Sequence, residues 1–332
     1  MRRAAVALGA LALAGSVASA GVVRWALAPL DSAGSESVFV VAPGESLPAI
    51  AARLEESGLV RDRRVVELVG RCRDLASRLQ AGEYRLSAAQ GPEQILEQIA
   101  NGDVITYEVA FPEGITAAEF ANRLAEAGLV ERDAFLAVVR DAEAPRTLGV
   151  EGATLEGYLF PETYRFSRGT PPLEIARAMV GQFQRVWAEL APRARERGLS
   201  MRDAVTLASI VEKETGVPEE RPLIAAVFLN RLRRGMRLET DPTVIYGIPD
   251  FDGNLRRRDL ENEANPYNTY RIAGLPPGPI ASPGEQALRA VVHPAESDYL
   301  YFVSRNDGSQ TFSRSYADHL AAVNRFQRTG GS

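Results

Sequence analysis

The sequence predicts an α+β protein with an N-terminal transmembrane helix, one or two small α+β modules and a larger α+β domain. Three observations lead to this prediction: an uncharged N-terminal run, an internal repeat of a helical pattern, and a change after Ala144-Pro145 to long loops rich in proline, glycine, asparagine and tyrosine. We expect four segments: a membrane anchor at 1–30, a first module at 36–105, a second repeat copy or connecting subdomain at 106–148, and the large domain at 149–330.

The composition excludes several classes of function. The 332 residues carry 38 basic and 43 acidic side chains, and the formal net charge of −5 disfavours a nucleic-acid partner, which needs a basic face. A single cysteine, Cys72, forms no internal disulfide and no CxxC site. The two histidines, His293 and His319, give no HExxH motif, so zinc hydrolysis and a Ser-His-Asp triad are both poorly supported.

The N-terminal segment predicts export of the chain. After Arg2 and Arg3, Ala4–Val23 is a run of 20 residues without a charge, and about 1.5 Å per helical residue lets it span a bilayer. The positive-inside rule then places the bulk of the chain on the periplasmic or extracytoplasmic side of a single-pass inner-membrane protein. A cleaved signal peptide is the alternative, since Ala18-Ser19-Ala20 has the form of a cleavage site.

Two stretches, 44–62 and 114–133, repeat the frame G-x-[ST]-x-x-x-x-A-x-R-L-x-x-x-G-L-V at an offset of 70 positions. Each follows an apolar strand-like run, at Val38–Val41 and Val104–Phe111. Each predicts a helix that starts after Ser46 or Thr116 and ends at a glycine able to adopt the left-handed C-cap conformation, and Thr116 with Glu119 forms a capping box.

A second helix, at about Arg61–Gln80, and a short strand, Gly82–Leu86, complete a module in the order strand, helix, helix, strand. That order resembles LysM modules, which bind N-acetylated sugars of cell-wall glycans. The alternative is a duplicated spacer, because neither copy offers a dense set of exposed aromatic residues, and Tyr84 and Tyr107 lie in predicted strands.

The stretch "EGATLEGYLFPETYRF", residues 151–166, gathers aromatic residues, Tyr158 among them, around Glu156 and Glu162. Rings that stack on sugar faces and carboxylates that accept hydroxyl hydrogen bonds are typical of a glycan site. Core packing under a loop uses the same residues, so both interpretations stay open.

The segment "LASIVEKET" places two glutamates, Glu212 and Glu214, at the end of an apolar helix. Ser200 caps this helix and it is expected to run from Met201 to Thr215, where Gly216 and Pro218 follow. Two residues correspond to about 200° of rotation, so the carboxylates point to different sides and form no shared dyad. A carboxyl against the apolar face has a raised pKa, as a general acid requires. The alternative is that both glutamates are merely solvated.

Three stiff polar loops follow: "MRLETDPTVIYG" (236–247), "NPYNTYRIAGLPPGPIASPGEQAL" (265–288) and "YLYFVSRNDGSQTFSRSYADH" (299–319). The last predicts a β-hairpin around an Asn-Asp-Gly turn. Stiff loops with polar side chains are where binding sites are usually built.

Together with "EGYLFPETYRF", "LASIVEKET" and "VFLNRL", these loops resemble the YceG-like family of endolytic murein transglycosylases. The resemblance implies a lyase of cell-wall biogenesis that cleaves the MurNAc-β-1,4-GlcNAc bond of nascent peptidoglycan, terminates glycan strands and leaves 1,6-anhydro-MurNAc ends. It places the family's catalytic glutamate on Glu214, which serves first as acid and then as base. It also implies glycan-polymerising penicillin-binding proteins as partners.

Tyr267, Asn268 and Tyr270 are the first candidates for glycan contacts or for holding the transition-state sugar, with Glu156, Thr240 and Asp241 as further candidates and Glu212 in support. We expect no cofactor and no metal, because the sequence has no phosphate loop, dinucleotide fingerprint or metal cluster. Two alternatives remain: a two-carboxylate hydrolase that uses Glu214 and Asp241, and a non-catalytic peptidoglycan-binding scaffold.

Overall fold

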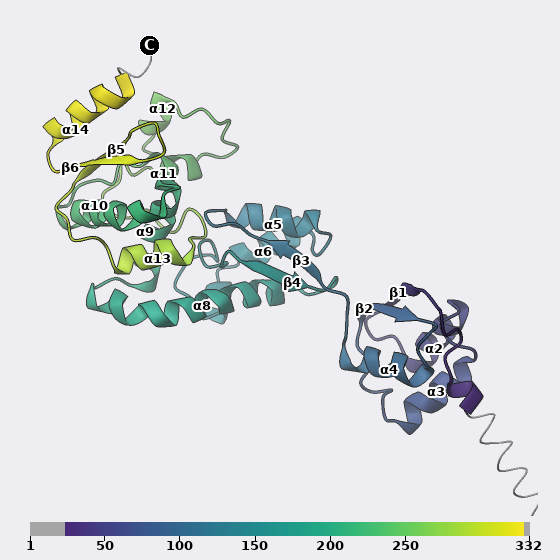
Figure 1. The fold of residues 1–332 in the computed structure, drawn as a ribbon. Coiled ribbons are helices and arrows are strands. Elements are labelled where there is room, and N and C mark those ends of the chain that lie inside the picture. The colour runs from purple at the N-terminus through teal and green to yellow at the C-terminus, as the bar shows by residue number, and fades with distance from the viewer. Residues whose placement is uncertain (1–23, 329–332) are drawn as a thin grey trace, which may run out of the picture. The chain divides into compact units, whose positions relative to one another are not determined.

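A computed structural model describes residues 24–328 of the chain (Figure 1). It is a mixed α+β protein, as predicted, and divides into two compact units. Unit 1 is the chain up to Tyr107 together with Phe166–Gly169, and unit 2 is Glu108–Arg165 together with the chain from Thr170 onward. The predicted anchor lies mostly outside the described residues. Within 24–328, no helix combines the length and the apolar character that a bilayer crossing needs.

Unit 1 has the predicted order of strand, helix, helix and strand, followed by one more helix. Its elements are β1 (Glu36–Val41), α2 (Leu47–Glu56), α3 (Arg63–Cys72), β2 (Gly82–Ser87) and α4 (Pro92–Asn101). The two strands pair antiparallel, with Glu36 opposite Ser87 and Val41 opposite Gly82. One buried cluster, from Phe39 to Ala100, forms its core. The resemblance to LysM modules stays a prediction.

Two details of unit 1 differ from the sequence prediction. The second helix ends at Cys72 instead of about Gln80, because Asp74 adopts a φ of 54° and the Leu75 N–H donates to the Gly70 carbonyl at 2.8 Å. Helix α4 was not predicted. Its signals were Pro92 at the first turn and Gly102, which ends it with a φ of 73°.

The second repeat copy lies in unit 2 except for Tyr107 and Phe166, which belong to unit 1, and it has the order strand, helix, helix and strand with one short helix added before the closing strand. It contains β3 (Tyr107–Ala110), α5 (Ala117–Glu126), α6 (Arg132–Arg140), the short α7 (Ala144–Thr147) and β4 (Thr163–Phe166). Strand β3 is shorter than the predicted 104–111, and it pairs with β4. The capping box is present: the Thr116 N–H donates to Glu119 Oε2 at 2.7 Å. Gly58 and Gly128, which end the first helix of each copy, both have a φ of 67°.

The remainder of unit 2 is a helical core around α9. Its main helices are α8 (Pro172–Glu196), α9 (Met201–Glu214), α10 (Arg221–Arg233) and α13 (Glu285–Val292). Helix α9 contacts α8, α10, α13 and the short α11 (Asp241–Tyr246), and it is buried without interruption from Ala204 to Val211 (Figure 1). The Ser200 hydroxyl accepts the Asp203 N–H at 3.0 Å, which fixes its start.

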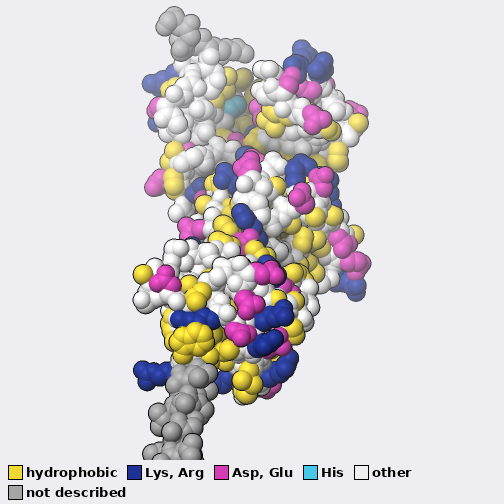
Figure 2. All heavy atoms as spheres, turned by 90° about the vertical axis from the view of Figure 1, so that its right-hand side faces the viewer, with side chains coloured by type: hydrophobic (Ala, Val, Ile, Leu, Met, Phe, Trp, Pro, Cys, Tyr) yellow, Lys and Arg dark blue, Asp and Glu magenta, His cyan; other side chains and the backbone are white. Residues whose placement is uncertain are grey.

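The predicted hairpin is confirmed at the C-terminal end of unit 2. Strands β5 (Tyr301–Ser304) and β6 (Gln310–Ser313) pair antiparallel, and α14 (Tyr316–Val323) and a π-helical turn (Asn324–Arg328) follow. Helix α14 contacts both strands, and β5 contacts α10. One further short helix, α12 (Arg257–Leu260), lies in the loop after α11. On the face drawn in Figure 2, basic and acidic side chains are intermingled.

Candidate active site

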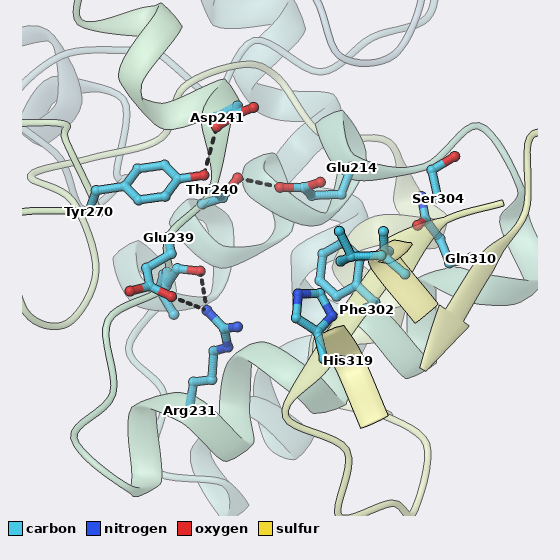
Figure 3. Close-up of a pocket in the computed structure, with 13 residues that line it drawn as sticks. Glu214, Arg231, Glu239, Thr240, Asp241, Tyr270, Phe302, Ser304, Gln310 and His319 are labelled. Carbon is cyan, nitrogen blue, oxygen red and sulfur yellow. Dashed lines mark hydrogen bonds and ion pairs between the residues drawn. The ribbon is translucent and has the colours of Figure 1, made fainter. Parts of the chain in front are cut away.

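Glu214, the last residue of α9, lies at a cleft of about 470 Å³ in unit 2 (Figure 3). Five parts of the chain form its walls: the end of α9, α10 at Arg231, the loop from Leu238 to Asp241, the proline-rich loop at Tyr270, and the C-terminal hairpin with α14. Its lining residues are Glu214, Arg231, Leu238, Glu239, Thr240, Asp241, Tyr270, Phe302, Val303, Ser304, Gln310, His319 and Val323. The cleft therefore combines one glutamate on a rigid helix with polar and aromatic side chains from loops and a hairpin.

Thr240 holds the carboxylate of Glu214. Its hydroxyl donates a hydrogen bond to Glu214 Oε1 (Figure 3). Thr240 is also the N-cap residue of α11, a position where a threonine hydroxyl normally accepts a backbone N–H of its own helix, and here it makes no such bond. The preceding residue, Glu239, has a φ of 51°, which is uncommon for a non-glycine residue. The conformation of this loop thus directs the Thr240 hydroxyl toward Glu214, and the hydroxyl does not cap α11.

Burial raises the pKa of Glu214 to about 7. Three neighbours modify this effect: the hydrogen bond from Thr240 lowers the pKa, the charge of Asp241 raises it, and the charge of Arg231 lowers it. A carboxyl with a pKa near neutrality is protonated often enough to donate a proton and ionised often enough to take one back. Glu214 therefore has the protonation behaviour of a general acid and base.

Asp241 provides a second carboxylate in the same cleft. The Tyr270 hydroxyl donates to Asp241 Oδ1 at 2.7 Å (Figure 3). Tyr270 comes from the proline-rich loop, and Asp241 comes from the first turn of α11. The structure thus brings together four of the predicted residues: Glu214, Thr240, Asp241 and Tyr270.

The opposite wall contains residues that the sequence prediction did not include. Arg231 of α10 donates through Nε to the Leu300 carbonyl at 2.7 Å and pairs with Glu239 at 3.3 Å. His319 of α14 stacks on Tyr301 with ring centroids 5.2 Å apart, and Figure 3 shows its imidazole directed into the cleft. Burial, followed by the charge of Arg231, lowers the pKa of His319. The "VFLNRL" motif contains Arg231, but nothing in its spacing indicates a site.

Glu212 has a different environment from Glu214. Its side chain is 5% exposed, and Oε1 accepts from Arg221 Nη2 at 2.7 Å while Oε2 accepts the Gly284 N–H at 2.9 Å. These bonds tie α9 to the starts of α10 and α13. The two glutamates thus bind separate partners and form no dyad, as the helical spacing predicts.

Two other predicted residues, Tyr158 and Asn268, are fully buried and contact their own loops and the hydrophobic core. Tyr158 is fully buried, its hydroxyl donates to the Glu151 carbonyl, and its ring packs edge-on against Phe183. Asn268 is fully buried too, and its amide donates to the carbonyls of Asp259, Leu260 and Asn262. Because neither side chain has exposed surface, both fit the supporting role that the sequence also allowed, and a direct contact with the glycan stays a prediction.

Glu156 and Tyr267 lie together at a separate small cavity of about 90 Å³. Glu156 accepts the Ala117 N–H at 3.0 Å and the Tyr246 hydroxyl at 3.2 Å. Tyr267 packs against the Tyr246 ring at 4.8 Å. Because Ala117 starts α5 and Tyr246 ends α11, Glu156 connects the second repeat copy to the helix that begins at Asp241. Neither residue lines the cleft at Glu214.

No set of three or more His, Cys, Asp or Glu side chains in the described part of the chain is arranged to hold a metal ion.

Comparisons with known proteins decide the family. The model of the YceG-like family matches residues 39–325. The chain belongs to the YceG-like family. That match covers unit 1 from residue 39 onward as well as the residues that line the cleft.

Relatives of this YceG-like chain carry names that describe an activity. An endolytic murein transglycosylase of Bacillus subtilis is 30% identical over 90% of this chain and 88% of its own length. An endolytic murein transglycosylase of Streptococcus pneumoniae is 29% identical over 88% of this chain, which spans 59% of that longer protein. The crystal structure of a YceG-like protein from Listeria monocytogenes matches with a TM-score of 0.59 and 30% identity, over 86% of this chain and 98% of that one.

Proposed function

We propose that the chain is a peptidoglycan lytic transglycosylase that cuts inside glycan strands at the MurNAc-β-1,4-GlcNAc bond. One observation carries the proposal: Glu214, with a pKa raised to about 7, lies in a cleft lined by polar and aromatic side chains and accepts a hydrogen bond from Thr240. The names of the Bacillus and Streptococcus relatives support the same reaction.

In the proposed mechanism Glu214 acts twice. Its protonated carboxyl gives a proton to the glycosidic oxygen, the bond from C1 to that oxygen breaks, and the GlcNAc leaves with a free 4-hydroxyl. The Glu214 carboxylate then takes the proton of the C6 hydroxyl of the MurNAc, whose O6 attacks C1. A 1,6-anhydro-MurNAc end forms, no water is consumed, and Glu214 is protonated again for the next cut.

A two-carboxylate hydrolase is the second candidate, and the position of Asp241 favours it. Asp241 lines the same cleft as Glu214, and Tyr270 fixes its carboxylate. In a retaining mechanism Asp241 would attack C1 and water would later release the sugar, while in the transglycosylase Asp241 only stabilises the positive charge that develops at C1. The two mechanisms differ in their products.

Mass spectrometry of the products tests the proposal. The full chain is incubated with uncrosslinked glycan strands, beside Glu214→Gln and beside Glu174→Gln, an exposed carboxylate on α8 that serves as the control. We expect anhydro-MurNAc ends from the wild type and the control, and a rate for Glu214→Gln lower by about 10²- to 10⁴-fold, the usual size of general-acid catalysis.

Other outcomes would contradict parts of the proposal. Reducing ends that carry an added water would establish the hydrolase and make Asp241 its second carboxylate. Strands that bind but stay intact with the wild type would indicate the non-catalytic scaffold.

The proposal extends to location and partners. Residues 1–30 would anchor the chain in the inner membrane and hold units 1 and 2 on the periplasmic side, which the uncharged run of 20 residues supports. Unit 1 would act as a LysM-like glycan-binding module, which its strand, helix, helix, strand order supports. Glycan-polymerising penicillin-binding proteins would supply the nascent strands.

A further inference from the structure

A second hollow, of about 430 Å³, shares Glu214 with the cleft and no other lining residue. We name it the Lys213 pocket. Its remaining lining residues are Glu113, Gly114, Glu212, Lys213, Thr215, Gly216 and Arg221. An enzyme that cuts inside a strand has substrate on both sides of the broken bond. A hollow that touches Glu214 therefore lies where substrate groups next to that bond can reach.

Lys213 is the only lysine in the chain, since the other 37 of the 38 basic residues are arginines. Lysine differs by carrying a compact, strongly hydrated ammonium with three donors in place of a planar fork. The single lysine stands between Glu212 and Glu214, next to the proposed acid, where its ammonium can meet an anionic group of a ligand.

The charges of the Lys213 pocket are only partly balanced. Glu212 and Arg221 pair at 2.7 Å and are both almost fully buried, so they neutralise each other. Lys213 is exposed, donates to the Gly114 carbonyl at 3.2 Å, and forms no ion pair within the described residues. Glu113 is 45% exposed and lies 3.5 Å from Arg221. One ammonium and one loosely held carboxylate thus remain available to a ligand.

The rim of the pocket is preorganised. The Gly114 N–H donates to the Ser282 carbonyl at 2.9 Å, and the Ser282 N–H donates to the Ile115 carbonyl at 2.8 Å. Gly114 has a φ of 77°, and a Cβ at this position would lie 3.7 Å from Lys213 Cδ. In addition, Arg221 is 7% exposed and its Nε has no hydrogen-bond partner among the described residues, so the wall keeps an unused donor.

We propose that the Lys213 pocket binds the short peptide carried by the muramic sugar beside the cleaved bond. Lys213 receives a carboxylate of that peptide, and Glu113 receives its amino group. Murein peptides carry both groups and begin at the lactyl substituent of the MurNAc, so they lie close to the bond that Glu214 cuts. This inference rests on the proposed function, because it takes murein as the substrate.

Binding to the inactive full chain tests the inference without any turnover. In the Glu214→Gln background, Kd is measured for fluorescent glycan strands that keep their peptides and for the same strands with the peptides removed. We expect the peptide-bearing strands to bind about tenfold more tightly, the order of one or two charge-assisted hydrogen bonds. Lys213→Met should reduce this preference to about one, and Lys213→Arg should restore only part of it.

Chemical changes of the peptide provide matched controls. Amidation of the peptide carboxylates should weaken binding to the parent but should not weaken binding to Lys213→Met any further. Acetylation of the peptide amino group should likewise weaken binding to the parent but not to Glu113→Gln. Arg177→Met, an exposed cation on α8, should keep the full preference. Equal affinity of the parent for both kinds of strand, or a preference that survives Lys213→Met, would overturn the inference.

The two proposals fail separately in these experiments. If the wild type leaves all strands intact while the Kd preference follows Lys213, the peptide pocket stands and the transglycosylase activity does not. If the wild type cuts both kinds of strand and no variant shows a Kd preference, the activity stands and the peptide pocket does not.

Discussion

At the scale of single residues, the proposed mechanism depends on the proton of Glu214. Its pKa is raised to about 7, and in the proposed mechanism the acid form starts the reaction. We therefore expect kcat/KM to fall as the pH rises above about 7, by about tenfold per unit, since the free enzyme loses the required proton there. The hydrogen bond from Thr240 lowers this pKa, so Thr240→Val should move the decline to higher pH.

Initial rates between pH 5 and 9 provide the measurement, with Glu174→Gln as a variant whose profile should match the wild type. A profile of Thr240→Val that coincides with the wild type would show that the decline does not report on Glu214.

Glu156 provides a second residue-scale prediction, for stability. Burial raises its pKa from 4.5 to about 7, so the folded chain binds more protons than the unfolded chain between these values. The stabilisation from this proton is complete below pH 4.5 and is lost as the pH rises through 7. Between pH 5 and pH 8 the free energy of unfolding of the wild type should fall by about 2 to 3 kcal/mol more than that of Glu156→Gln, because each pKa unit corresponds to about 1.4 kcal/mol.

Urea unfolding followed by the fluorescence of buried Trp187, in the same unit, measures this difference. Equal pH dependence of the two proteins would mean that Glu156 does not keep its proton in the folded state.

The sequence predicted only some of the residues that line the cleft. Glu214, Thr240, Asp241 and Tyr270 were identified because they lie in unusual motifs, and the cleft contains all four. Tyr158 and Asn268 lie in the same motifs and are buried, because a conspicuous motif contains the residues that shape a loop as well as those that face the cleft. Arg231 and His319 were missed because only tertiary packing brings α10 and α14 to Glu214.

At the scale of elements, the proline-rich loop depends on Asn268. Its buried amide donates to three carbonyls and its oxygen accepts the Tyr270 N–H at 3.1 Å. Asn268→Ala leaves these groups unpaired and should lower the free energy of unfolding of unit 2 by about 2 kcal/mol or more. It should also slow the reaction, because Tyr270 orients Asp241.

Asn122→Ala is the matched control, since Asn122 is exposed on α5 and its side chain accepts one hydrogen bond within residues 24–328, from Arg132. The effect of this substitution on the free energy of unfolding should stay within about 0.5 kcal/mol. Trp187 fluorescence during urea unfolding and the initial cleavage rate measure the two effects. If Asn268→Ala behaves like the control in both measurements, the conformation of the loop does not depend on Asn268.

Element boundaries followed local signals where these were strong. The caps at Ser200 and Thr116 and the glycines at 58 and 128 set helix ends where the sequence predicts them. Helix α3 ended early because the turn after Cys72 is made by Asp74, a residue that only occasionally adopts a left-handed conformation. The second repeat copy was recognised by its helices, but its closing strand β4 lies beyond an inserted segment that contains α7. Repeat spacing alone therefore gave no sign that β3 and β4 pair.

At the scale of the whole molecule, units 1 and 2 have separate hydrophobic cores, so we expect them to unfold independently. The core of unit 1 runs from Phe39 to Ala100 and is closed by the β1–β2 pair. Leu54 is fully buried in this core, and Leu54→Ala should destabilise unit 1 by about 2 to 5 kcal/mol, the range for a buried leucine. Unit 2 should keep its stability, because the removed side chain contributes nothing to its core.

The two tryptophans distinguish the units: Trp25 stacks under Arg61 of unit 1, and Trp187 is buried in α8 of unit 2. In single-tryptophan variants, Leu54→Ala should shift the urea midpoint reported by Trp25 and leave that reported by Trp187 unchanged. Leu207→Ala, at a fully buried position in α9, should do the reverse. One common transition that shifts in both reporters would mean that the units unfold together. A destabilising substitution in unit 1 would then lower activity by unfolding the unit that contains Glu214, and not by weakening the binding of substrate.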